Sequence, residues 1–257
     1  CEFPNFALPI CQYIVDILAS QKKGNLSVEK NLVSCVDPND SASPTFRSIS
    51  TILDENGQTI EAKNQVSVLC FRTLKGIFAL NLPRPEGHAT NIDVCKMIIS
   101  SLSVFKDHSI NEAIFDCSET LVELYPQIGA QLFNGKICSF CIEALRLQKG
   151  RSFTCQRSLR LLSAILKFIE RSAEGLRKDD FVAVVVGVIT SQSNCQNIQT
   201  AGMTLLAVYE RGNKFNIPHN IPLNYKNELE ILAERASRLW EGNGSLQRAV
   251  GSLFGAK

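Results

Sequence analysis

Residues 181–209 read FVAVVVGVITSQSNCQNIQTAGMTLLAVY and contain two apolar segments separated by a polar turn. The first segment is rich in valine, but it lies between signals typical of helices, so we interpret it as a buried helix rather than a strand. In the second segment Ile198, Ala201, Leu205 and Val208 recur at i, i+3, i+7 and i+10. This spacing places them on one stripe of a helix. The stretch therefore predicts two helices that pack against each other.

The same spacing occurs elsewhere in the chain. Residues 111–124 align without a gap on residues 195–208, at an offset of 84 positions. Residues 155–165 form an intermediate copy, and residues 70–80 and 246–253 form two more. Any amphipathic helices share part of this periodicity, but a gap-free match over two helices favours a repeating unit of about 42 residues. Each copy has a small residue that lets helices approach closely, namely Thr73, Cys117, Ser158, Ala201 and Ala249.

The remainder of the chain also reads as helices separated by short loops. Ser109 to Glu112 form a capping box with Ser109 as the N-cap, and Pro126 is expected to end that helix. The fold class expected is all-α, in a single domain over residues 1–257, with irregular helices over 1–63 and repeats over 64–257. Within the repeats we expect helices at residues 64–80, 91–105, 109–126, 136–148, 153–172, 180–191, 194–211, 224–240 and 245–254.

This pattern resembles armadillo and HEAT repeats, which are stacked helical hairpins. The resemblance covers roughly residues 64–257 and is closest over residues 181–209. It implies a right-handed α-solenoid of about five helical-hairpin repeats. The chain departs from the armadillo pattern because it lacks the regular glycine between the first two helices and the asparagine ladder of importins. Two-helix, HEAT-like units fit at least as well.

Composition narrows the classes of protein further. The 257 residues are 45% hydrophobic and 20% charged, with a formal net charge of +2. These values are typical of globular domains and exclude disorder and coiled coils. The longest apolar run, residues 181–189, is far shorter than the roughly 20 residues of a membrane-spanning helix. Because the chain begins with Cys1, we expect a fragment or processed product of a longer protein.

Ten cysteines raise the question of disulfides. Seven of them fall in apolar helical patterns, where a free thiol behaves as a small hydrophobe: Cys11, Cys70, Cys95, Cys117, Cys138, Cys141 and Cys155. The pair Cys138 and Cys141 forms a CxxC without a second ligand pair, which favours buried thiols over zinc. We therefore expect an intracellular protein, cytoplasmic or nuclear. Glycosylation sequons at Asn25 and Asn243 keep a secreted protein as the alternative.

The sequence gives little support for catalysis or for binding of a cofactor or metal. The three histidines, His88, His108 and His219, have no nucleophile motif around them, and no phosphate-binding glycine loop is present. We therefore expect no enzyme activity, no cofactor, no metal site and no small-molecule substrate.

A basic segment is the main candidate for a binding site. Residues 146–178 contain nine Lys and Arg against two Glu, a local charge of +7. On a helix Arg157, Arg160, Lys167 and Arg171 fall within about 80° of arc, opposite the apolar stripe. The predicted partner-binding residues are Arg146, Lys149, Arg151, Arg157, Arg160, Lys167 and Arg171.

Three functions compete for this segment. The first is a non-catalytic scaffold or adaptor that docks an acidic helix or peptide on the basic ridge. The alternative is a nucleic-acid-binding helical-repeat module that uses the same ridge, for which Phe153 and Phe168 are the available aromatic side chains. The third is an adaptor whose contacts lie on its terminal helices. A solvated helix face without a partner would carry the same charges.

Overall fold

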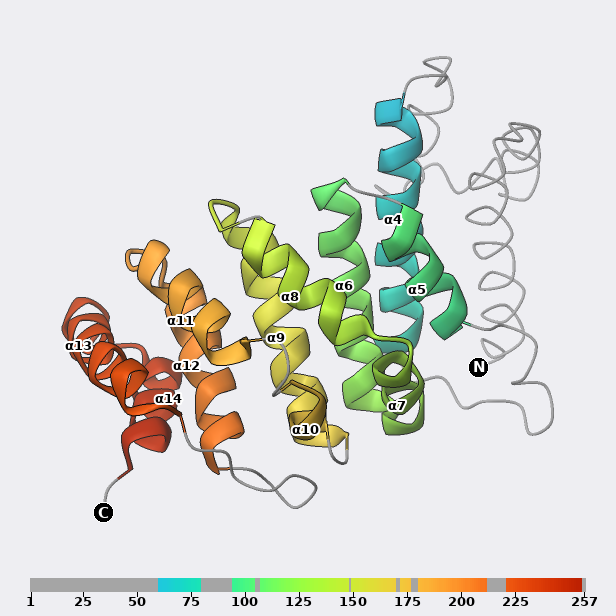
Figure 1. The fold of residues 1–257 in the computed structure, drawn as a ribbon. Coiled ribbons are helices and arrows are strands. Elements are labelled where there is room, and N and C mark those ends of the chain that lie inside the picture. Colours follow the sequence, from blue (N-terminus) through green and yellow to red (C-terminus); the bar gives the residue numbers. More distant parts are fainter. Residues whose placement is uncertain are drawn as a thin grey trace, which may run out of the picture. The chain divides into compact units, whose positions relative to one another are not determined.

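Helices account for all the regular secondary structure in the part of the chain that the computed structural model describes (Figure 1). The described residues are 60–79, 94–104, 107–147, 149–169, 172–176, 180–211 and 221–255. Across these ranges there are eleven helices and no strand. They are α4 (Ile60–Ala79), α5 (Val94–Val104), α6 (His108–Leu124), α7 (Pro126–Asn134), α8 (Ile137–Leu147), α9 (Ser152–Phe168), α10 (Ser172–Leu176), α11 (Phe181–Ser191), α12 (Gln196–Arg211), α13 (Leu223–Leu239) and α14 (Gly244–Phe254).

The all-α prediction is thus confirmed for the described residues, and the valine-rich segment is the buried helix α11. The helices expected before residue 60, together with Cys11 and Arg171, lie outside the described residues. The chain divides into two compact units, Cys1–Thr120 and Leu121–Lys257, and the boundary falls near the end of α6.

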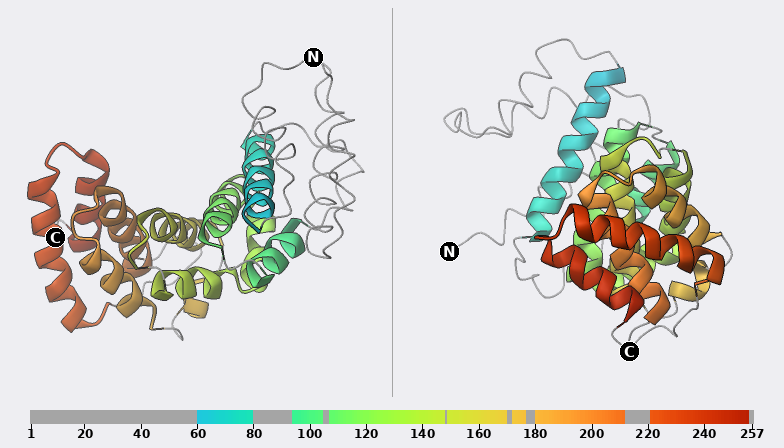
Figure 2. Two further views of the ribbon diagram at one scale, coloured as in Figure 1. Left: turned by 90° about the horizontal axis from the view of Figure 1, so that it is seen from above. Right: turned by 90° about the vertical axis from the view of Figure 1, so that its left-hand side faces the viewer.

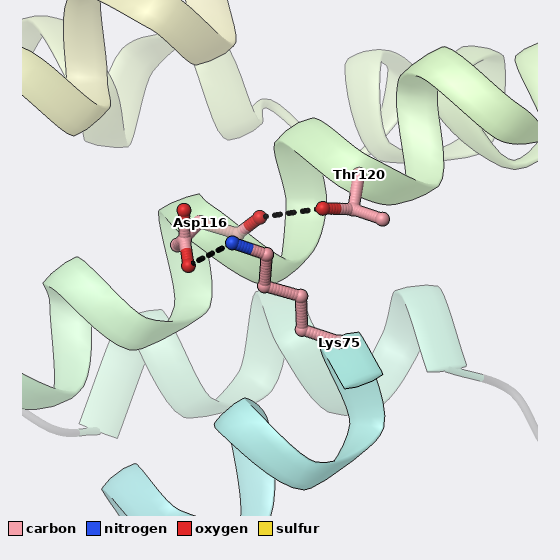
Figure 3. A network of polar contacts seen from close by, with 3 residues as sticks. All are labelled: Lys75, Asp116 and Thr120. Carbon is pink, nitrogen blue, oxygen red and sulfur yellow. Dashed lines mark hydrogen bonds and ion pairs between the residues drawn. The ribbon is translucent and has the colours of Figure 1, made fainter. Parts of the chain in front are cut away.

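The first unit contains α4, α5 and most of α6. Its core includes Phe71 and Leu74 from α4, Ile98 from α5 and Ile114 from α6, all fully buried. An ion pair ties α4 to α6, because Lys75 Nζ lies 2.6 Å from Asp116 Oδ2 (Figure 3).

The second unit is built from helices that pair in sequence order. Short turns join α8 to α9, α11 to α12 and α13 to α14, and the two helices of each pair pack against each other. Across the pairs, α11 contacts α8 and α13, while α12 contacts α9 and α14. The unit therefore has two layers, α8–α11–α13 and α9–α12–α14, which the views in Figures 1 and 2 let the reader follow. The shorter helices α7 and α10 pack on α9.

Many of the hydrogen bonds that join one helix pair to the next share a similar separation along the chain. A series of them joins residues 38 to 43 positions apart, close to the expected unit length. The series contains Lys75–Asp116, Lys149–Gln192, Ser152–Gln192, Thr190–Glu228, Asn194–Arg235, Thr200–Asn243 and Arg211–Gly251.

One local prediction was wrong, and one helix was missed. The helix α6 begins at His108, and Asp107 rather than Ser109 is its N-cap. The Asp107 carboxylate accepts hydrogen bonds from the Ser109 and Ile110 backbone amides, which have no partner within the helix. Pro126 follows the end of α6 but also begins α7, which the sequence analysis missed. A proline suits the first position of a helix as well as its end.

The cysteines within the described helices are buried and form no disulfide bond, as predicted for Cys70, Cys95, Cys117, Cys138, Cys141 and Cys155. Burial raises the pKa of the Cys70 thiol to about 12. Burial is also the main cause that raises the pKa of the Cys141 thiol, and the neighbouring Cys138 raises it further. Thiols held in the protonated form are poor nucleophiles.

Among the described helices, none is both long enough and apolar enough to cross a membrane.

Candidate functional site

Helix α9 carries the centre of the predicted basic ridge and is almost enclosed by the second unit. It packs against α8, α12, α7 and α10, so that ten of its residues are buried. The buried set includes Ser158, Leu162 and Ile165 of the repeated stripe, as expected. What remains at the surface is a narrow strip with exposed Phe153, Arg160 and Lys167 and half-buried Arg157.

The structure separates the predicted site residues into two groups. Arg157, Arg160 and Lys167 lie on the α9 strip, whereas Arg146, Lys149 and Arg151 are exposed around the turn between α8 and α9. Arg171 lies outside the described residues. The sequence-predicted ridge is therefore a helix strip plus a turn, because α9 begins only at Ser152.

One side chain from the next helix pair, Gln192 at the end of α11, holds this turn in place. The Gln192 amide donates to the Lys149 carbonyl oxygen at 2.7 Å, and the Ser152 hydroxyl donates to Gln192 Oε1 at 3.1 Å. The Lys149 ammonium lies beside Gly187 of α11, where an added Cβ would stand 3.6 Å from Nζ. Lys149 is thus positioned against the α8–α11–α13 layer.

Two large apolar side chains flank the same turn. Leu147 is 75% exposed at the end of α8, and Phe153 is 70% exposed in the first turn of α9. Together with Arg146, Lys149 and Arg151 they form an exposed group of three cations and two apolar side chains. Such a mixture is typical of binding surfaces that combine charge with apolar contact.

The fold adds two cations that the sequence analysis missed. Arg211 in α12 and Arg248 in α14 are exposed on helices of the same layer as α9. The angle around each helix axis can be measured from the buried residue that opens that helix's copy of the repeated stripe. On this measure the five cations of α9, α12 and α14 lie at about 120° to 220°. They therefore share the outer side of the layer, and we call this set the basic face: Arg157, Arg160, Lys167, Arg211 and Arg248.

A signal for Arg248 was present in the repeat. Arg248 follows Leu246 by two positions, as Arg157 follows Cys155, so the two arginines occupy equivalent positions. Arg211 has no such signal, because it lies at the end of its helix beyond the repeated pattern.

The two layers differ strongly in charge. Helices α9, α12 and α14 contain five basic residues and one acidic residue, a net charge of +4. The acidic residue is Glu210, and Lys226 of α13 forms an ion pair with it. Helices α8, α11 and α13 contain four basic and four acidic residues and are neutral. Among these six helices, the net positive charge is thus concentrated in the α9–α12–α14 layer.

An open cavity of about 260 Å³ lies where α12 and α14 meet on this layer. It is lined by Thr204, Ala207, Val208, Arg211, Arg248, Ala249 and Ser252. No group of three His, Cys, Asp or Glu side chains among the described residues is arranged to hold a metal ion.

No family model matches the chain, and no curated protein matches it.

Proposed function

We propose that the chain is a non-catalytic, intracellular protein–protein interaction scaffold that docks an acidic partner segment on its basic face. The observation that carries the proposal is the concentration of +4 on the α9–α12–α14 layer, opposite a neutral layer. A surface of one sign attracts partners of the opposite sign and accelerates their association.

We further propose that the helix pairs form an armadillo/HEAT-type α-solenoid. Two features support this: the succession of paired helices in the second unit, and the hydrogen bonds between residues 38 to 43 positions apart. In stacked repeats each unit contacts its neighbours, and the stack presents an extended surface for binding. Buried free thiols are usual in reducing compartments and support an intracellular protein.

The test compares two charge-matched double variants in a crosslinking pulldown from cell extract. Arg160→Glu/Lys167→Glu alters the basic face, while Arg235→Glu/Arg238→Glu makes the same change of charge on α13. We expect the first variant to lose a partner that the second retains. Once purified, that partner should bind the wild-type chain and the α13 variant but not Arg160→Glu/Lys167→Glu. Thermal unfolding followed by circular dichroism shows that both variants fold. Retention of every partner by Arg160→Glu/Lys167→Glu, or equal loss in both variants, contradicts the proposal.

A second candidate, nucleic-acid binding, is favoured by the exposure of Phe153 next to Arg151. Exposed aromatic side chains beside cations stack on unpaired bases. For this function a labelled single-stranded oligonucleotide should bind with an affinity that falls steeply with salt, with a slope of about −0.7 per contacted phosphate. Phe153→Ala should weaken binding at least fivefold, since stacking contributes about 1–3 kcal/mol per base. Removal of the pulldown partner by nuclease would select this function over protein docking.

A further inference from the structure

We propose that Asn134 is a site of spontaneous deamidation in the native chain, whereas the fold protects Asn243 from the same reaction. Deamidation converts asparagine to aspartate or isoaspartate and is favoured where glycine follows. Two of the three Asn-Gly pairs in the sequence lie in the described residues, namely Asn134 with Gly135 and Asn243 with Gly244. The structure places these two pairs in opposite settings, at the end of one helix and at the start of another.

The reaction needs only the side-chain amide, the next backbone nitrogen and water. The Gly135 nitrogen attacks Cγ of Asn134, so an N–Cγ bond forms, the Cγ–Nδ2 bond breaks, and the amide proton leaves with ammonia. Water then opens the succinimide ring. Cleavage of the new N–Cγ bond gives aspartate, and cleavage of the original backbone C–N bond gives isoaspartate. Glycine favours the attack because it has no Cβ to crowd the approaching groups.

The setting of Asn134 leaves this reaction open. Asn134 is the last residue of α7, and its side chain is exposed. Among the described residues, none forms a hydrogen bond with its amide. The attacking Gly135 nitrogen donates to the Gln131 carbonyl oxygen at 2.9 Å, at the end of the helix. Bonds at helix ends open readily because the ends fray, so the nitrogen becomes available without unfolding of the core.

The setting of Asn243 opposes the reaction. Asn243 is the N-cap of α14, and its Oδ1 accepts from the Ser245 and Leu246 amides at 3.0 and 3.1 Å. Its Nδ2 also donates to Thr200 Oγ1 of α12 at 3.4 Å. The cap directs the side chain to the second and third amides of the helix rather than to the Gly244 nitrogen. Attack by that nitrogen therefore requires the cap to be released first.

The test compares the two sites within the same molecule. The full chain is incubated at pH 8, in buffer and in guanidinium chloride, and peptide mass spectrometry follows the conversion of each asparagine over time. The rate in denaturant divided by the native rate gives a protection factor in which the effect of local sequence cancels. We expect protection below about fivefold at Asn134 and above about twentyfold at Asn243, since helix ends open far more easily than capped, packed segments.

A variant tests the chemistry. Gly135→Ala suits the observed φ of −74°, which alanine adopts without strain, but adds a Cβ beside the attacking nitrogen. It should slow conversion of Asn134 at least about tenfold, in buffer and in denaturant alike, and leave Asn243 unchanged. The measurement in denaturant does not depend on folding of the variant.

Three results would overturn the inference. Equal protection at the two sites would show that the α14 cap and the end of α7 do not control the reaction. Stronger protection at Asn134 than at Asn243 would reverse the assignment. Unchanged conversion of Asn134 in Gly135→Ala would show that the Gly135 nitrogen is not the attacking group.

Discussion

At the scale of single residues, Gln199 connects the two helices of a pair. Its side chain is only 1% exposed. Its amide nitrogen donates to the carbonyl oxygens of Ile189 at 2.7 Å and Gln192 at 3.2 Å, at the end of α11. The last carbonyls of a helix have no partner within it, so Gln199 satisfies acceptors that burial would otherwise leave unpaired.

Gln199→Leu keeps the volume of the side chain but removes both donors. We expect the free energy of unfolding to fall by about 1–3 kcal/mol, the cost of buried acceptors without a partner. Urea denaturation followed by circular dichroism measures this loss. Gln196→Leu, at an exposed position of the same helix, is the control and should change stability by less than about 0.5 kcal/mol. Equal effects of the two substitutions would show that the Gln199 hydrogen bonds contribute nothing.

Asp107 makes the stability of the first unit depend on pH. Burial alone would raise the pKa of its carboxyl group, but hydrogen bonds from Ser109 and from the Ile110 amide stabilise the carboxylate and hold the pKa below its ordinary value of 3.8. The folded state therefore releases this proton at a lower pH than the unfolded state does. The stabilisation is complete above pH 3.8 and is lost as the pH falls through the folded-state pKa.

Asp107→Ala should lower the free energy of unfolding by about 0.5–2 kcal/mol at pH 7, as expected for the loss of an N-cap. The difference from wild type should shrink as the pH is lowered from 7 to well below 3.8, because the wild-type carboxylate then becomes protonated in the folded state as well. Urea denaturation over this pH range measures it. A difference that stays constant or grows on acidification would contradict the assignment of Asp107 as an ionised cap.

At the scale of helices, Gly202 sets how closely α12 approaches α11. A Cβ added at Gly202 would stand 2.5 Å from Ile189 Cγ1 and 2.6 Å from Ile189 Cδ1. Because Ile189 is fully buried, its side chain has little room to move away. Glycine is therefore required here by helix packing rather than by backbone conformation.

Gly202→Ala should destabilise the protein by about 1–3 kcal/mol, the usual cost of overpacking a core. Gly251→Ala is the matched control, since nothing lies within 4 Å of an added Cβ at that helical position, and it should be neutral or stabilising by up to about 1 kcal/mol. In an Ile189→Ala background the cost of Gly202→Ala should fall, because the clashing atoms are absent. An unchanged cost in that background would show that Ile189 is not the cause.

The helices show what sequence reasoning can and cannot predict. The i, i+3, i+7 stripe correctly identified the buried sides of α9, α12 and α14, because burial requires apolar residues at a fixed period. The short helix α7 was missed because Pro126 is compatible with both the end and the start of a helix. Arg211 was missed because its charge is isolated in the sequence, and only the packing of α12 beside α9 and α14 adds it to the basic face.

At the scale of the whole molecule, all but one of the described cysteines lie in buried positions. Cys70, Cys95, Cys117, Cys138, Cys141 and Cys155 are buried, whereas Cys195, in the turn before α12, is half-buried. Reaction of a thiol requires both access and the thiolate form.

We therefore expect Cys195 to be alkylated first among the described cysteines when the native protein is treated with iodoacetamide at pH 8. Peptide mass spectrometry at increasing times measures each site. Cys70 and Cys141, whose pKa values are raised, should react only after urea is added. Alkylation of either of them as fast as that of Cys195 would contradict the burial of the thiols.

The series of hydrogen bonds between residues 38 to 43 positions apart has a consequence for how the chain folds and how its gene can change. In that series, each bond closes a loop of about one helix pair, never several, so forming it costs only a modest loss of chain entropy. A topology of this kind favours fast folding by successive addition of one pair to the next. It also means that duplicating or deleting the coding segment for one pair preserves the bonding pattern of the others, so that lineages can lengthen or shorten such a chain without redesigning it.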